Sequence, residues 1–124
     1  MAEKQVVRAG GAYLPVNGIS DGFSLWHIAL FTSVIAMLFL LDILTTQEIL
    51  NLGGVELNPA MVGIVGLPLM HVLIKFGFLL AVIPVTLVAE SKVKGSGFYF
   101  YAALIALYTV VLINNALVLL PMLR

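Results

Sequence analysis

Cysteine is absent from this chain, and so is the H-E-x-x-H motif of zinc-dependent hydrolysis. The lack of cysteine excludes disulfides, thiolate metal sites and cysteine nucleophiles. No serine stands beside His71, and the sequence contains no H-E-x-x-H, the motif of zinc-dependent hydrolysis. An enzymatic role is therefore the weakest of the functional readings, and we expect no catalytic activity of the chain's own.

Charge is also scarce. Only 10% of the 124 residues are charged, whereas a soluble domain carries about 25%. Six basic and six acidic residues cancel, so the sequence offers no basic field for nucleic acid. Hydrophobic residues make up 62% of the chain and its mean hydropathy is +1.16. A single domain of this size cannot hide so much apolar surface from water, so the expected solvent is a lipid bilayer.

Three apolar segments are long enough to cross a bilayer as helices, which requires about 20 residues each. The predicted spans are residues 25–51, 59–89 and 97–120. Gly53 offers a C-terminal cap to the first span, and Pro121 lies just beyond the third. Asn58 and Pro59 suit the N-cap and first turn of the second.

The predicted architecture is an all-α, polytopic membrane protein. Residues 24–124 form the transmembrane domain, with three helices in a left-handed bundle. Residues 1–23 form a short polar tail without an apolar stretch, so we expect no cleavable signal peptide. No cofactor is predicted.

The distribution of Lys and Arg predicts the orientation. Lys4 and Arg8 precede the first span, and Lys92 and Lys94 separate the second from the third. The loop between the first two spans has no basic residue. By the positive-inside rule we expect a multi-pass protein of the cytoplasmic membrane, with the N-terminus inside and the C-terminus outside.

A few polar residues interrupt the apolar spans. Ionisable groups within a bilayer are expensive and usually face the interior of a helix bundle. Because side chains lean toward the N-terminus of their own helix, those of neighbouring antiparallel spans lean toward one another. We therefore expect one polar cluster in the outer half of the membrane, formed by Asp42, Thr45, Thr46, His71, Lys75, Asn114 and Asn115. Its expected charge pair is Asp42 with Lys75 or His71, and Glu56 and Asn58 lie above it in the loop.

The third span carries a related signal. Tyr101, Tyr108 and Asn115 recur at intervals of seven, the seam spacing of left-handed helix packing. This stripe is expected to face the neighbouring spans and to carry Asn115 inward. Depth is a difficulty, however: counted from Pro59 at about 1.5 Å per residue, His71 and Lys75 lie deeper than Asp42.

Two short motifs resemble a known family. D-x-x-T-T at residues 42–46, then G-G-V-E-L-N-P at residues 53–59 and Lys75 in the next span, are similar to small archaeal and bacterial membrane proteins catalogued as a domain of unknown function. The resemblance covers the first two spans and their loop. It implies three or four spans and no established activity, and it singles out Asp42, Thr45, Thr46, Glu56, Asn58 and Lys75.

Simpler structural roles compete with a functional site. Asp42, His71 and Lys75 could serve only to fix helix register through a buried ion pair. Thr45 and Thr46 are the kind of residue that hydrogen-bonds a carbonyl one turn back. Asn114 and Asn115 often join helices without binding ligands.

Three functions remain at this point. In the first, the chain is a subunit of a membrane assembly with copies of itself or with larger membrane subunits, because three helices can hardly enclose a pathway alone. In the second, an oligomer carries protons or cations, with Asp42 as the titrating or ligating carboxylate and a bound hard cation. His71 beside Asp42 and Glu56 would instead favour a transition metal. The third is an intramembrane acid–base or metal-dependent enzyme. The sequence favours the first.

Overall fold

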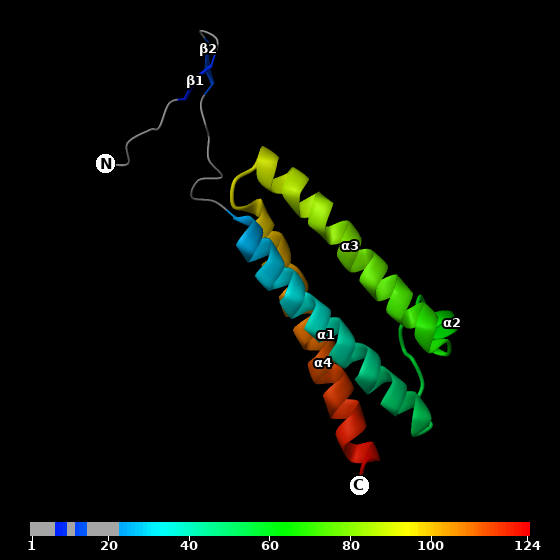
Figure 1. Ribbon diagram of the computed structural model, residues 1–124. Helices are drawn as coiled ribbons and strands as arrows, with labels where there is room; N and C mark the ends of the chain where they lie inside the picture. Colours follow the sequence, from blue (N-terminus) through cyan, green and yellow to red (C-terminus); the bar gives the residue numbers. More distant parts are fainter. Residues whose placement is uncertain (1–6, 10–11, 15–22) are drawn as a thin grey trace.

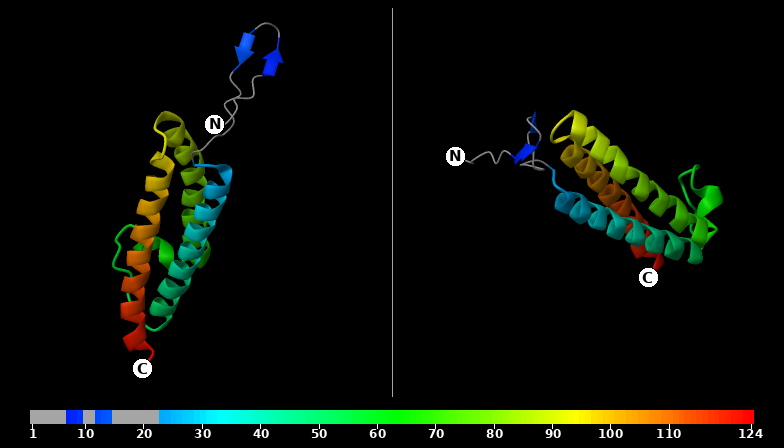
Figure 2. Two further views of the ribbon diagram at one scale, coloured as in Figure 1. Left: turned by 90° about the vertical axis from the view of Figure 1, so that its left-hand side faces the viewer. Right: turned by 45° about the horizontal axis from the view of Figure 1, so that its top comes forward.

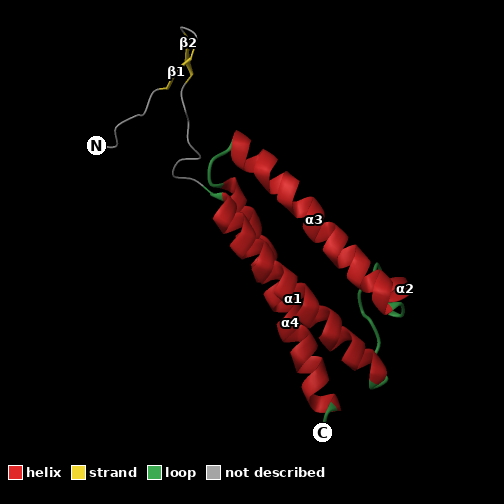
Figure 3. Cartoon of the chain, viewed as in Figure 1, coloured by secondary structure: helices red, strands yellow, loops and turns green. Residues whose placement is uncertain are grey.

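The computed structural model describes residues 7–9, 12–14 and 23–124 of the chain. From residue 23 onward the structure is helical, and three of the helices are long and apolar enough to cross a membrane (Figures 1 and 3). These are α1 (Leu25–Asn51), α3 (Pro68–Lys92) and α4 (Ser96–Met122), and the short helix α2 is Val62–Val65. The predicted all-α, three-span architecture is confirmed.

Most of the predicted tail, residues 1–23, lies outside the described residues. Two short strands fall within it: β1 (Val7–Ala9) pairs antiparallel with β2 (Ala12–Leu14). Phe23 belongs to the helical part of the molecule, because its ring stacks on Phe31 at 5.8 Å between centroids.

Helix α1 has the predicted bounds, and its C-terminal end explains one glycine. Gly53 adopts a φ of +85°, a left-handed conformation that residues with a side chain rarely adopt. Its N–H donates to the carbonyl of Leu50 at 3.0 Å, and the N–H of Leu52 donates to Glu48 at 3.1 Å. These bonds satisfy carbonyls that the end of the helix would otherwise leave unpaired.

The second long helix begins at Pro68, so the prediction that it begins at Pro59 was wrong. Asn58 stabilises a separate turn instead: its side-chain Oδ1 accepts from the N–H of Ala60 at 3.1 Å, and its carbonyl accepts from Met61 at 2.9 Å. The chain then forms α2 before α3 starts, with Pro68 in its first turn. The helix therefore begins at Leu67–Pro68 and not at Asn58–Pro59. Both prolines suit the first turn of a helix, so the sequence did not distinguish them.

The third long helix extends slightly beyond its predicted bounds. Helix α4 runs to Met122, so Pro121 lies inside its last turn rather than beyond it. The difference is within the one or two residues by which helix ends are ordinarily defined.

The three long helices pack side by side, and the views in Figure 2 show α3 and α4 joined by a short turn at one end. We call this the 93–95 end, and the opposite end, where residues 52–67 connect α1 to α3, the 52–67 end. The core between the helices contains Ile35 and Phe39 of α1, Leu79 and Val82 of α3, and Tyr101 of α4. The hydroxyls of Tyr101 and Thr32 lie 2.7 Å apart, which gives the core an α1–α4 hydrogen bond.

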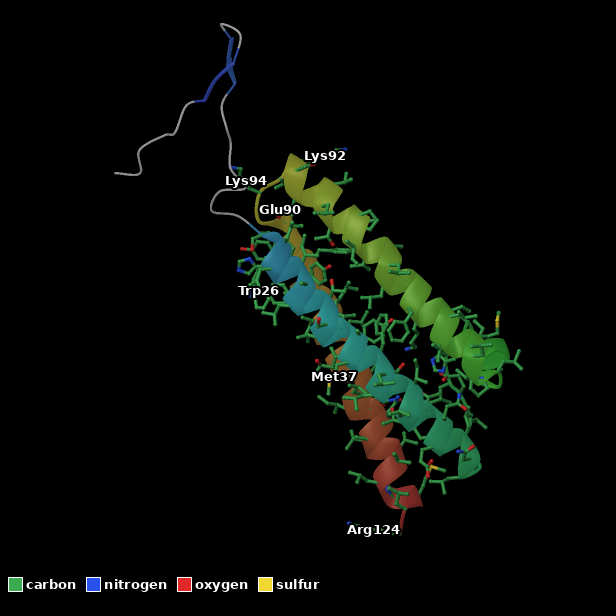
Figure 4. The ribbon with its side chains drawn as sticks, viewed as in Figure 1. Trp26, Met37, Glu90, Lys92, Lys94 and Arg124 are labelled. Atoms are coloured by element: carbon green, nitrogen blue, oxygen red, sulfur yellow. The ribbon has the colours of Figure 1, made fainter. Side chains whose placement is uncertain are left out.

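The outer surface of the bundle is apolar. One large side chain from each long helix illustrates this: Met37 is 63% exposed, Leu80 70% and Leu117 66%. Met37 lies on the outside of the bundle in Figure 4. A surface of this kind suits contact with lipid tails, as expected of a multi-pass membrane protein.

Candidate functional site

Because α3 begins at Pro68 and not at Pro59, Asp42, Lys75 and Asn115 lie at similar depths along the helix axes. Asp42 lies about 14 Å from the end of α1 at Asn51, counted along the helix axis. Lys75 lies about 10 Å from the start of α3 at Pro68, and Asn115 about 10 Å from the end of α4 at Met122. All three helix ends belong to the 52–67 end, so the depth mismatch expected from a start at Pro59 disappears.

An ion pair joins α1 to α3 at this level. The ammonium of Lys75 donates to Oδ2 of Asp42, and the two side chains are only 11% and 5% exposed. Of the two partners that the sequence allowed for Asp42, the structure selects Lys75. Removing one member of such a buried pair leaves an uncompensated charge, which is why these pairs hold elements together even where they add little net stability.

Asn115 brings the third helix to the same carboxylate. Its side-chain Nδ2 donates to Oδ1 of Asp42 at 2.9 Å and lies 3.1 Å from Oγ1 of Thr45 and 3.4 Å from Oγ1 of Thr46. Thr45 also donates to the carbonyl of Leu41, one turn back, at 2.9 Å. We call Asp42, Thr45, Thr46, Lys75 and Asn115 the three-helix polar cluster.

Aromatic rings flank the ammonium of Lys75. Nζ lies 5.4 Å from the ring centroid of Phe39 and 5.1 Å from that of Tyr108, and the two rings are 4.4 Å apart. The negative face of an aromatic ring attracts a cation, most strongly away from water. The charge of Lys75 is therefore stabilised by a carboxylate and by rings from both neighbouring helices.

His71 does not join the cluster through a hydrogen bond. It is only 1% exposed, and among the described residues its Nδ1 has no hydrogen-bond partner. It sits in the first turns of α3, about 5 Å from Pro68. The prediction that placed it deep within a longer second span was therefore wrong.

Asn114 and the loop residues occupy the edge of the site. Asn114 is exposed, and no described residue hydrogen-bonds its side chain. Glu56 accepts from the backbone N–H of Asn58 at 2.8 Å, a local contact within the loop. Asp42, Glu56 and His71, the residues considered for a metal, do not form a group that could hold one, and neither does any other set of His, Asp and Glu in the described part of the chain.

A cavity of about 790 Å³ opens beside the polar cluster. It lies between α1, α3, α4 and the loop, and Figure 4 shows the side chains that fill the remaining space between these ribbons. Asp42, Lys75 and Asn115 border it, together with apolar residues of α3 and α4. A smaller cavity of about 70 Å³ shares Glu56 and Asn114 with it and adjoins the loop.

Two residues that help to form the site and its surroundings were not predicted from the sequence. Tyr108 was recognised only as part of a packing stripe, yet it borders the cavity and contacts Phe39 and Lys75. Gln47 donates to the carbonyl of Val65 at 2.7 Å and so ties α1 to α2. A polar amide near the end of an apolar helix was the available signal, but its backbone partner carries no sequence signature.

A family model described as a domain of unknown function, DUF5658, matches residues 33–121. The match includes every member of the three-helix polar cluster. The chain belongs to the DUF5658 family. No curated protein and no solved structure matches it. The expected family membership is thereby confirmed at the level of a domain of unknown function, while the D-x-x-T-T pattern as a family signature and the archaeal and bacterial occurrence stay predictions.

Proposed function

We propose that this DUF5658 protein is a small subunit of a membrane assembly and that it associates with other membrane helices, its own copies or larger subunits, through α4. Helix α4 is the least covered of the three. No residue in its most apolar 18-residue stretch is buried, whereas 28% of the corresponding stretch of α1 is. A partner helix would find an accessible surface there.

Asn114 is the observation that carries the proposal. Its exposed side chain lies about 12 Å from the end of α4 at Met122, where it borders both cavities, and no described residue hydrogen-bonds it. A side-chain amide without a hydrogen-bond partner inside a membrane is costly, and an asparagine that bonds across helices in a membrane contributes about 1–2 kcal/mol in model peptides. Asn114 is thus a group that gains from a neighbouring helix.

The small side chain of Ala103 supports the proposal that this face of α4 binds a partner helix. Residues 103 and 114 are eleven apart, which is close to three full helical turns, so they point in nearly the same direction. Ala103, Leu107 and Val110 are all exposed between the inner part of α4 and Asn114. A small residue allows two helix backbones to approach closely.

Conduction of protons or cations through Asp42 finds less support in the contacts. One oxygen of Asp42 accepts from Lys75 and the other from Asn115, so its charge is already balanced within the chain. A cation would have to displace an ammonium flanked by two aromatic rings. We therefore propose that the role of the three-helix polar cluster is to hold the helices of the bundle together.

We also propose that the 52–67 end faces outward. Lys92 and Lys94 lie at the opposite end, as Figure 4 shows, and only Arg124 lies at the end of α4. The positive-inside rule places the end with more basic residues in the cytoplasm.

The test measures the mass of the assembly. The protein is extracted from its native membrane in a mild detergent, and its mass and chain composition are determined by light scattering and mass spectrometry. We expect an assembly larger than one chain, weakened about five- to thirtyfold in dissociation constant by Asn114→Leu. Asn51→Leu, which replaces another exposed asparagine at the end of α1, should leave it unchanged. A single chain in the wild-type extract, or equal effects of the two substitutions, would overturn the proposal.

A further inference from the structure

The cavity beside the polar cluster has the size of a ligand site. Its volume of about 790 Å³ falls within the range of about 300–1,000 Å³ typical of small-molecule pockets. We propose that it binds an uncharged amphiphile with a hydroxyl-bearing head and one hydrocarbon chain. The inference requires only a single copy of the protein. Leu107 and Val110 belong both to the cavity wall and to the α4 face proposed above for association, so the ligand and a partner helix would meet at the same surface.

Two polar groups without hydrogen-bond partners define where the head would bind. His71 borders the cavity and is 1% exposed, yet its Nδ1 makes no hydrogen bond among the described residues. Tyr108 borders the same cavity, and its hydroxyl likewise makes no hydrogen bond within the described part of the chain. A buried polar atom without a partner is unfavourable, so His71 gains from a ligand that bonds to it, and the partly exposed Tyr108 can bond to the same ligand.

The chemistry of these groups selects a hydroxyl. Nδ1 of a neutral histidine is a donor in one tautomer and an acceptor in the other, whereas a hydroxyl both donates and accepts. The Tyr108 hydroxyl can also act in either direction. A hydroxyl-bearing head can therefore satisfy both groups whichever tautomer His71 adopts, while a carbonyl could only accept.

The charges around the cavity disfavour an ionic head. Lys75 is the basic residue at the cavity, and it is already paired with Asp42. Glu56 is the remaining acidic residue at the cavity, near the loop, and would repel an anion. A cation would be drawn toward Glu56, away from His71 and Tyr108, which carry no negative charge to attract it.

The apolar residues that border the cavity suit a hydrocarbon chain. Ile74 and Phe78 of α3 and Leu107, Val110 and Val111 of α4 border the cavity. Four of them are also among the exposed large hydrophobic residues of the molecule: Ile74, Phe78, Leu107 and Val110. A chain lying along them would bury apolar surface from both helices.

The test uses 1-monoolein that carries a diazirine in its acyl chain. The protein is placed in phosphatidylcholine nanodiscs, labelled by light over a range of probe concentrations, and the adducts are mapped by mass spectrometry. We expect saturable labelling of the α3 and α4 residues that border the cavity, competed by unlabelled monoolein more strongly than by oleate or oleyltrimethylammonium. Labelling that does not saturate, or stronger competition by either ion, would overturn the proposal.

Matched tyrosine variants test the contact itself. Tyr108→Phe removes one hydroxyl and should weaken monoolein competition by about three- to tenfold, the effect of one hydrogen bond. Tyr99→Phe removes the hydroxyl of a tyrosine that does not border the cavity and should have no effect. Val111→Trp should reduce saturable labelling further by filling the cavity. Equal affinities of the two tyrosine variants would contradict the inference.

Discussion

Replacing Lys75 by methionine should destabilise the bundle strongly. The substitution keeps the length of the side chain but leaves the carboxylate of Asp42, which is 4% exposed, with Asn115 as its remaining cross-helix partner. Breaking a buried pair from one side destabilises a protein by about 3–5 kcal/mol, whereas an exposed pair contributes about 0–1 kcal/mol. The burial of Asp42 decides between these values, so we expect the larger one.

The free energy of unfolding would be measured by titration with sodium dodecyl sulfate in mixed micelles. Lys92→Met, which removes an exposed lysine from the last turn of the same helix, is the control and should change it by less than about 0.5 kcal/mol. Adding Asp42→Asn to Lys75→Met removes the stranded charge while retaining an amide for Asn115, and should restore most of the lost stability. A loss below about 1 kcal/mol for Lys75→Met, or no recovery in the double variant, would refute the reasoning.

Two further substitutions test other parts of the account. Asn115→Leu removes the donor to Oδ1 of Asp42 and should lower the free energy of unfolding by about 1–3 kcal/mol in the same titration, because the carboxylate is left under-bonded; an unchanged value would show that α4 does not contribute to the cluster. Gly53→Ala should cost about 1–2 kcal/mol, since alanine must adopt a φ of +85°, and Gly63→Ala, where an added Cβ meets nothing within 4 Å and the backbone has no positive φ, should cost less. Equal losses at the two glycines would contradict the strain argument.

The sequence predicted the number of spans, the bounds of α1 and the residues of α4 that face the neighbouring helices. These follow from run length and from a seven-residue stripe, which depend on local pattern alone. Tyr101, Tyr108 and Asn115 all contact α1, through Thr32, Phe39 and Asp42 respectively. Neighbouring positions on a helix point about 100° apart, so the stripe also explains why Asn115 faces inward while Asn114 is exposed.

The start of the second long helix could not be predicted in the same way. Asn58–Pro59 and Leu67–Pro68 both offer proline to a first helical turn, and the apolar residues between them extend the hydrophobic run without a break. The structure resolves the ambiguity through contacts distant in sequence, such as Gln47 with the carbonyl of Val65. This one difference moved His71 toward the helix end and brought Lys75 to the level of Asp42.

The choice of Lys75 over His71 as the partner of Asp42 also lay beyond the sequence. The two residues are four apart and share a helix face, so the helical spacing predicts that both point toward Asp42. Their depth decides between them, and depth depends on where α3 begins. Once the helix begins at Pro68, the longer side chain sits opposite the carboxylate, with Phe39 and Tyr108 on either side.

The most direct test measures the distance between Lys75 and Asp42 in a lipid bilayer by solid-state NMR. The chain has only two aspartates, Asp21 and Asp42, so an Asp21→Asn background makes the Asp42 carboxyl carbon a unique ¹³C label beside ¹⁵N-labelled lysine. We predict strong nitrogen-dependent dephasing of this carbon, as for a salt bridge, and its disappearance in Lys75→Met. A carboxyl signal with no dephasing in the unsubstituted Lys75 protein would contradict the three-helix polar cluster.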